Sequence, residues 1–162
     1  MAAITSKTEA FKGPPTLDGL AYLKQTDPGE VEAMQWLNNQ PRTQSMVILE
    51  ATGGQYSRFG RVASATGIPT VLGWAGHEVQ WRGSDRALRG RAEDIDQIYQ
   101  APDKRQVLPL LQKYNVNYVY VGSLERGKYP GGALLAFEQV LDAVFKNESV
   151  TIYQTRAATG AR

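Results

Sequence analysis

The residues of this chain best suited to chemistry lie together in one glycine-bounded stretch, from Leu72 to Gly83. The stretch holds the only histidine of the protein, two of its three tryptophans and a Glu/Arg pair. These side chains follow one another at intervals of three or four residues, so one or two helical turns would bring them onto a single face. The candidate binding residues of this stretch are Trp74, His77, Glu78, Trp81 and Arg82.

A purely structural interpretation competes with a binding site for each of these residues. The tryptophans could pack in the core, and Glu78 could pair with Arg82 at the surface. A buried segment with a purely structural role, however, would not normally contain three charged or titratable groups. We therefore favour a site for the set as a whole. The glycines at positions 73, 76 and 83 predict a loop with at most a short helical turn.

Familiar catalytic and metal-binding motifs begin in this sequence but are not completed. His77-Glu78 starts like the zinc motif H-E-x-x-H, but Trp81 stands where the second histidine would be. The chain has no cysteine, which excludes thiolate metal ligands and a cysteine nucleophile. The glycine-rich segment 52–60 fits neither a dinucleotide fingerprint nor a P-loop. We predict no catalytic residue, no metal and no cofactor.

A sugar suits the Leu72–Gly83 stretch better than a nucleotide does. A pyranose offers an apolar C–H face to an aromatic ring and hydroxyl groups to polar and charged side chains. The two tryptophans beside His77, Glu78 and Arg82 could supply both kinds of contact.

Apolar strand-like segments alternate with helical patterns along the rest of the chain. Asp27 as N-cap and Pro28 at the first helical position predict a helix that runs to about Asn39. Strands are expected over 45–51, 68–73, 115–121 and 149–155, and further helices over 56–65, 91–99, 104–114 and 133–145. This order predicts a three-layer α/β fold with a mostly parallel sheet of about four strands, flanking helices and Rossmann-like topology.

Such a sheet would place the candidate residues at one edge. Ligands of open α/β sheets bind outside the carboxyl ends of the strands, and the loops 52–56, 74–82 and 123–129 each follow an expected strand. The predicted substrate-binding set therefore also includes Glu50, Tyr56, Glu125 and Arg126.

The overall composition limits the class of protein. The 162 residues suffice for one domain, and 18 basic residues against 16 acidic ones give no indication of a nucleic-acid partner. No apolar run approaches the length of a membrane span, so the polypeptide is expected to be soluble. We predict a flexible lead-in over residues 1–15, a single α/β domain over 16–155 and a disordered tail over 156–162.

The motif Gly-Trp-x-x-His-Glu-x-x-Trp-Arg-Gly at residues 73–83 carries a family resemblance. Together with segments such as Val47–Ala51 and Tyr118–Gly122, it resembles the C-terminal soluble region of the YYY membrane proteins, over about residues 16–155. That family is similar to polytopic GT-C-type glycosyltransferases. The resemblance implies an extracytoplasmic domain whose partners are the transmembrane portion of the same protein and a sugar or polyprenyl-phosphate-linked sugar.

Three functional hypotheses follow from the residues and the resemblance. The first is a soluble domain of a membrane glycosyltransferase-like protein, inactive by itself, that contributes to substrate recognition through the His77 loop. The second is a free-standing α/β module that binds a sugar or another small ligand. The third is a hydrolase in which His77 works with Glu78 or Glu50.

Overall fold

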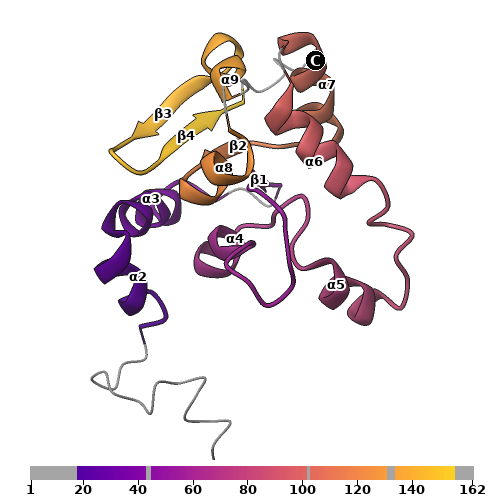
Figure 1. The fold of residues 1–162 in the computed structure, drawn as a ribbon, viewed down its shortest axis with the longest axis horizontal. Helices are drawn as coiled ribbons and strands as arrows, with labels where there is room; N and C mark the ends of the chain where they lie inside the picture. The colour runs from indigo at the N-terminus through magenta and orange to yellow at the C-terminus, as the bar shows by residue number, and fades with distance from the viewer. Residues whose placement is uncertain (1–17, 43–44, 102, 131–133, 156–162) are drawn as a thin grey trace, which may run out of the picture.

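The computed structural model describes residues 18–42, 45–101, 103–130 and 134–155 (Figure 1). The expected lead-in of residues 1–15 and the expected tail of residues 156–162 lie outside this part of the chain. Among the described helices, none combines the length and the apolar character that a membrane crossing requires. The elements in chain order are α2 (Ala21–Thr26), α3 (Pro28–Asn38), β1 (Ile48–Leu49), α4 (Arg61–Thr66), α5 (Ala75–Arg82), α6 (Arg91–Gln100), α7 (Lys104–Lys113), β2 (Tyr118–Val121), α8 (Ser123–Lys128), α9 (Leu135–Val140), β3 (Asp142–Lys146) and β4 (Thr151–Gln154).

The four strands form one sheet in the order β1-β2-β4-β3. Strand β1 pairs parallel with β2, whereas β4 pairs antiparallel with both β2 and β3. The predicted number of strands is confirmed, but the prediction of a mostly parallel sheet is wrong, because the described sheet is mixed. The Rossmann-like topology expected from a parallel sheet is therefore not established.

The error arises in the segment that was expected to be one long helix over 133–145. Helix α9 ends at Val140, and Asp142–Lys146 forms strand β3 instead. Asn147 closes the hairpin to β4, because its side-chain oxygen accepts the backbone N–H groups of Ser149 and Val150. A hairpin reverses the chain, so β4 pairs antiparallel where a crossover helix would have made it parallel.

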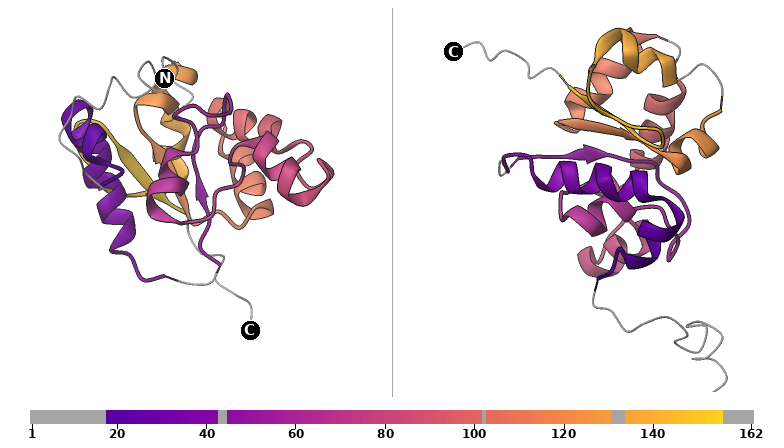
Figure 2. Two further views of the ribbon diagram at one scale, coloured as in Figure 1. Left: turned by 90° about the horizontal axis from the view of Figure 1, so that it is seen from below. Right: turned by 90° about the vertical axis from the view of Figure 1, so that its left-hand side faces the viewer.

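The predicted three-layer arrangement is present, because helices lie on both sides of the sheet (Figure 2). Along β2, Tyr118 and Tyr120 face one core while Val119 and Val121 face the other, as the alternation of a strand requires. Helices α2, α3 and α4 cover the first face, with Leu23, Met34, Leu37 and Val62 in that core. Helices α6, α7 and α9 cover the second face, with Ile95, Ile98, Tyr99, Val107 and Phe137.

Local signals set several element boundaries. Helix α3 begins as predicted: the Asp27 side chain accepts the N–H of Glu30 at 3.1 Å, and Pro28 opens the helix. The expected strand 68–73 is reduced to one parallel bridge between Thr70 and Ile48, in keeping with the missing N–H of Pro69. The expected loops 74–82 and 123–129 largely fold as helices α5 and α8.

Candidate functional site

Three chain segments leave the sheet at the same edge. Strands β1 and β2 are parallel, and the segment around Thr70 runs parallel to β1. The residues that follow each of them, 50–60, 71–82 and 122–128, therefore gather beyond the carboxyl ends of these strands. Two distinct groups of polar side chains lie there, and they differ in how well their hydrogen-bonding atoms are satisfied.

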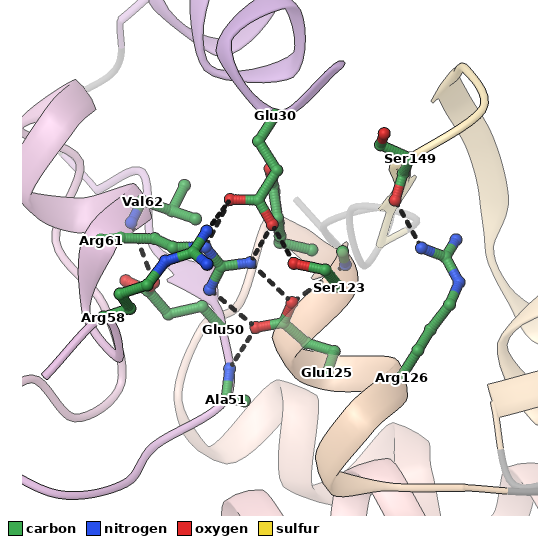
Figure 3. A network of polar contacts seen from close by, with 12 residues as sticks. Glu30, Glu50, Ala51, Arg58, Arg61, Val62, Ser123, Glu125, Arg126 and Ser149 are labelled. Carbon is green, nitrogen blue, oxygen red and sulfur yellow. Dashed lines mark hydrogen bonds and ion pairs between the residues drawn. The ribbon is translucent and has the colours of Figure 1, made fainter. Parts of the chain in front are cut away.

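The first group is a buried charge network centred on Arg61 (Figure 3). Its guanidinium binds Glu30 through two nitrogens, each 2.6 Å from a carboxylate oxygen, and a third contact of 3.0 Å joins Nη2 to Glu125 Oε2. The three side chains come from α3, α4 and α8 and are almost fully buried. Arg61 thereby ties together three helices that are far apart in the sequence.

The carboxylates of this network are fully engaged by the protein itself. Glu30 also accepts the Ser123 hydroxyl at 3.0 Å and has Arg58 at 4.0 Å. Glu125 accepts the N–H of Gly122 at 2.9 Å and that of Ala51 at 3.0 Å. These contacts join helix α8 to the segment that follows β1.

The charges of Arg61 and Glu30 stabilise each other. Burial alone would raise the pKa of Glu30, but the hydrogen bonds and charge of Arg61 outweigh it and hold that pKa below its usual value. Desolvation alone would lower the pKa of Arg61, but Glu30 and Glu125 raise it instead. Each charge therefore favours the ionised form of the other.

Glu50 lies beside this network and holds the start of helix α4. Its two oxygens accept the N–H of Val62 at 3.0 Å and of Ala63 at 2.9 Å, both free N–H groups of the first turn. Burial raises the pKa of Glu50 to about 7, although the two backbone hydrogen bonds and Arg61 act in the opposite direction. Glu50 and Glu125 were both predicted to bind substrate, and the structure places both inside the protein with every carboxylate oxygen already accepting a hydrogen bond.

The second group is a cluster of three rings, those of His77, Tyr56 and Trp74. The centroid of its imidazole lies 4.9 Å from the Tyr56 ring and 5.4 Å from the Trp74 ring, edge-on to both. Trp74 is fixed in turn, because its Nε1 donates to the carbonyl of Phe59 at 2.6 Å. Tyr56 has a positive φ of 56°, a conformation that costs a bulky residue free energy. The position of the imidazole ring is thus set by two aromatic neighbours.

His77 faces a pocket of about 500 Å³ between helices α4 and α5. The pocket is lined by both termini of the α5 stretch, the start of α4 and the segment around Thr70, through Gly60, Ala63, Ser64, Pro69, Thr70, Gly73, Trp74, His77, Glu78, Trp81, Arg82 and Arg91. Two of the lining residues, His77 and Thr70, each carry a buried side-chain atom, Nε2 and Oγ1, that has no hydrogen-bond partner among the residues the structure describes. Such atoms are rare in folded proteins because each costs free energy. We name this cavity the His77 pocket.

The charged groups of the His77 pocket already have hydrogen-bond or ion-pair partners within the chain. Glu78 accepts the N–H of Gly73 at 2.9 Å and lies 3.3 Å from the guanidinium of Arg82. Arg91 donates to the carbonyls of Ala87 and Val71 at 2.9 and 2.7 Å. Trp81, in contrast, has 88% of its surface exposed and so contributes little to the core.

A second cavity of about 850 Å³ adjoins the His77 pocket on the other side of Trp74. Its lining is mostly apolar, with Leu20, Leu23, Met34, Phe59 and Ala65, and also includes Arg58 and Arg61. Tyr56 lines this cavity, so the Tyr56 and Trp74 rings stand between it and His77.

The structure therefore divides the nine predicted binding residues into separate places. Five of them, Trp74, His77, Glu78, Trp81 and Arg82, line the His77 pocket, and Tyr56 packs against two of these. Glu50 and Glu125 belong to the buried network. Arg126 points away to the β3–β4 hairpin, where it donates to the carbonyl of Ser149 (Figure 3).

Sequence reasoning missed three residues that matter at this edge: Glu30, Arg61 and Thr70. Glu30 looked like an ordinary first-turn carboxylate, and its partners Arg61 and Ser123 are 31 and 93 residues away. Thr70 carried no signal at all, because an unpaired hydroxyl is visible only after packing is known. Among the described residues, no group of three His, Cys, Asp or Glu side chains is arranged to hold a metal ion.

Comparison with solved structures gives an informative similarity. The chain matches no protein-family model and no curated protein sequence. It is similar in structure to the C-terminal globular domain of an oligosaccharyltransferase from Archaeoglobus fulgidus, with a TM-score of 0.53. The match covers 78% of this chain and 95% of that domain at 10% sequence identity. At this identity the similarity establishes the fold alone.

Proposed function

We propose that this chain is the extracytoplasmic soluble domain of a membrane glycosyltransferase-like protein and that its His77 pocket contributes to recognition of a sugar or polyprenyl-phosphate-linked sugar. The domain is inactive by itself, and the transmembrane portion of the same protein is its partner. The fold shared with a globular domain of an oligosaccharyltransferase supports the class of protein. The resemblance of residues 73–83 to the YYY membrane proteins supports the same assignment.

One observation supports the binding role: two residues that line the pocket carry a buried polar atom, His77 Nε2 and Thr70 Oγ1, with no partner in the described part of the chain. A buried polar group without a hydrogen bond costs roughly 1–3 kcal/mol. A ligand that supplies the missing hydrogen bonds would recover this cost. Trp81, largely exposed beside the same pocket, offers an indole face that a sugar ring could cover.

The two alternative functions have less support from the geometry. A hydrolase would need a carboxylate placed to orient or activate His77, but Glu78 bonds to Gly73 and Arg82, and Glu50 bonds to helix α4. The imidazole instead packs against two aromatic rings. A free-standing sugar-binding module would use the same pocket. It differs from the proposed membrane-protein domain only in the gene that encodes it. A reading frame that continues upstream into membrane spans favours our proposal over that module.

Titration of the chain with a short-chain polyprenyl-phosphate hexose, followed by tryptophan fluorescence, tests the binding role. We expect Trp81→Ala to weaken binding at least tenfold, because covering an indole contributes about 1.5–3 kcal/mol. The variant should keep its stability within about 0.5 kcal/mol, since the side chain is exposed. The matched control is Tyr22→Ala, which removes another exposed aromatic that lies outside the His77 pocket.

Equal binding by the wild type and Trp81→Ala would contradict the role of this pocket. Loss of the cooperative thermal transition in Trp81→Ala would show that the indole stabilises the fold instead. Turnover of ester or glycoside substrates that His77→Ala abolishes would favour the hydrolase.

A further inference from the structure

Both cations of the His77 pocket already interact with acceptors of the protein. Arg82 is paired with Glu78 at 3.3 Å, so their charges largely cancel. Arg91 uses Nε and Nη1 on backbone carbonyls, and its guanidinium lies 5.7 Å from the centroid of the Tyr114 ring. A phosphate group in this pocket would therefore have to compete with protein acceptors for both arginines.

The groups that lack partners are, in contrast, an imidazole nitrogen and a hydroxyl. His77 Nε2 donates in one tautomer and accepts in the other, and the Thr70 hydroxyl can do both. A ligand hydroxyl is also donor and acceptor, so it satisfies Nε2 in either tautomer. A phosphate oxygen at neutral pH mostly accepts hydrogen bonds. It would therefore satisfy Nε2 only in the tautomer in which Nε2 carries the proton.

The geometry of the ring cluster makes His77 a selective contact. The imidazole contacts the rings of Tyr56 and Trp74 edge-on, and these contacts restrict its orientation. The exposed indole of Trp81 lines the same pocket. A ring-shaped ligand with an apolar face and hydroxyl groups at its edge meets both features.

We infer that the His77 pocket binds the pyranose ring itself, with His77 Nε2 and Thr70 Oγ1 as its hydroxyl contacts, and does not bind the phosphate of a lipid-linked sugar. This inference rests on the proposed sugar-recognition function and names the part of the substrate that this site takes. It also names Thr70, which no sequence motif indicated, as a binding residue.

Because the protein has one histidine, NMR of the ¹⁵N-labelled chain reports on His77 without assignment ambiguity. The probes are methyl α-D-glucopyranoside, methyl α-D-mannopyranoside and inorganic phosphate, each titrated into the full chain at one pH and matched ionic strength. We expect at least one glycoside to shift the Nε2 resonance saturably, and phosphate to leave it in place at the same concentration. Thr70→Val should weaken the glycoside about fivefold, the loss of one hydrogen bond, whereas the control Thr26→Val, far from the pocket, should not.

A saturable shift with phosphate and none with the glycosides would overturn the inference, while binding of the polyprenyl-phosphate hexose through its phosphate would leave the proposed function standing. No shift with any probe would also overturn it, and the fluorescence titration would then judge the proposed function separately. Unchanged glycoside affinity in Thr70→Val would remove Thr70 from the site.

Discussion

Two groups of buried polar side chains lie at the same edge of the sheet, and they are satisfied to different degrees. In the charge network every carboxylate oxygen of Glu30, Glu50 and Glu125 accepts a hydrogen bond from the protein. In the His77 pocket two buried polar atoms accept and donate none. Residues whose polar atoms are satisfied within the protein thus lie beside residues with buried atoms that lack a partner, although both groups contain the acid, base and aromatic types that suggest a site.

One buried atom beside the charge network also lacks a hydrogen-bond partner. The hydroxyl of Tyr120 is buried without a partner, although its ring lies beside the network, 5.4 Å from the Arg61 guanidinium. It lines neither of the two cavities beside Trp74. A ligand explanation is therefore confined to His77 and Thr70, two residues that line the same cavity.

Replacement of Arg61 should have the largest effect on the fold. Arg61→Met leaves the carboxylates of Glu30 and Glu125 buried without their cation, which typically costs 3–5 kcal/mol. Urea unfolding measures this loss. The control Arg89→Met breaks the exposed pair with Asp85 and should change the free energy of unfolding by less than about 1 kcal/mol. A similar small change in Arg61→Met would show that the network does not support the fold.

Replacement of Glu50 should change how stability depends on pH. The pKa of Glu50 is raised from 4.5 to about 7 in the folded protein, so between these values the native state holds a proton that the unfolded state has lost. Stability from this group is therefore present below pH 4.5 and is lost as the pH rises through 7, by on the order of 3 kcal/mol.

Glu50→Gln removes that titration. Its free energy of unfolding should fall less between pH 5 and pH 8 than that of the wild type, and the variant should be the less stable protein at pH 5, where the amide serves the N–H groups of helix α4 less well. Denaturant unfolding at the two pH values makes the comparison. Identical pH dependence in both proteins would contradict the assignment of a buried, protonated Glu50.

The elements that the sequence predicted well depend on short-range signals. Asp27 and Pro28 define the start of α3, and the β-branched and aromatic run 118–121 forms the central strand β2 with both faces buried. The β3–β4 hairpin was missed because residues 133–145 read equally well as helix, and a hairpin register depends on the turn at Asn147. Parallel or antiparallel pairing is a property of the chain path, which no local pattern in this segment determines.

For the site, the sequence identified the stretch 73–83 but not which of the surrounding residues join it. The loop-after-strand rule gathered Glu50, Glu125 and His77 at one edge, yet it did not distinguish a carboxylate that binds helix N–H groups from one that faces a ligand. That difference depends on partners such as Val62 and Arg61, whose positions arise only from packing.

The most direct measurement of the central claim is the free energy of unfolding of Thr70→Val without ligand. If the Thr70 hydroxyl is buried and unpaired, its replacement by a methyl group of similar shape should leave stability unchanged or raise it by up to about 1 kcal/mol. The same variant should bind the methyl glycoside more weakly. A loss of stability of 1 kcal/mol or more would show that the hydroxyl has a partner in the protein and would contradict the account of the His77 pocket as a site that awaits a ligand.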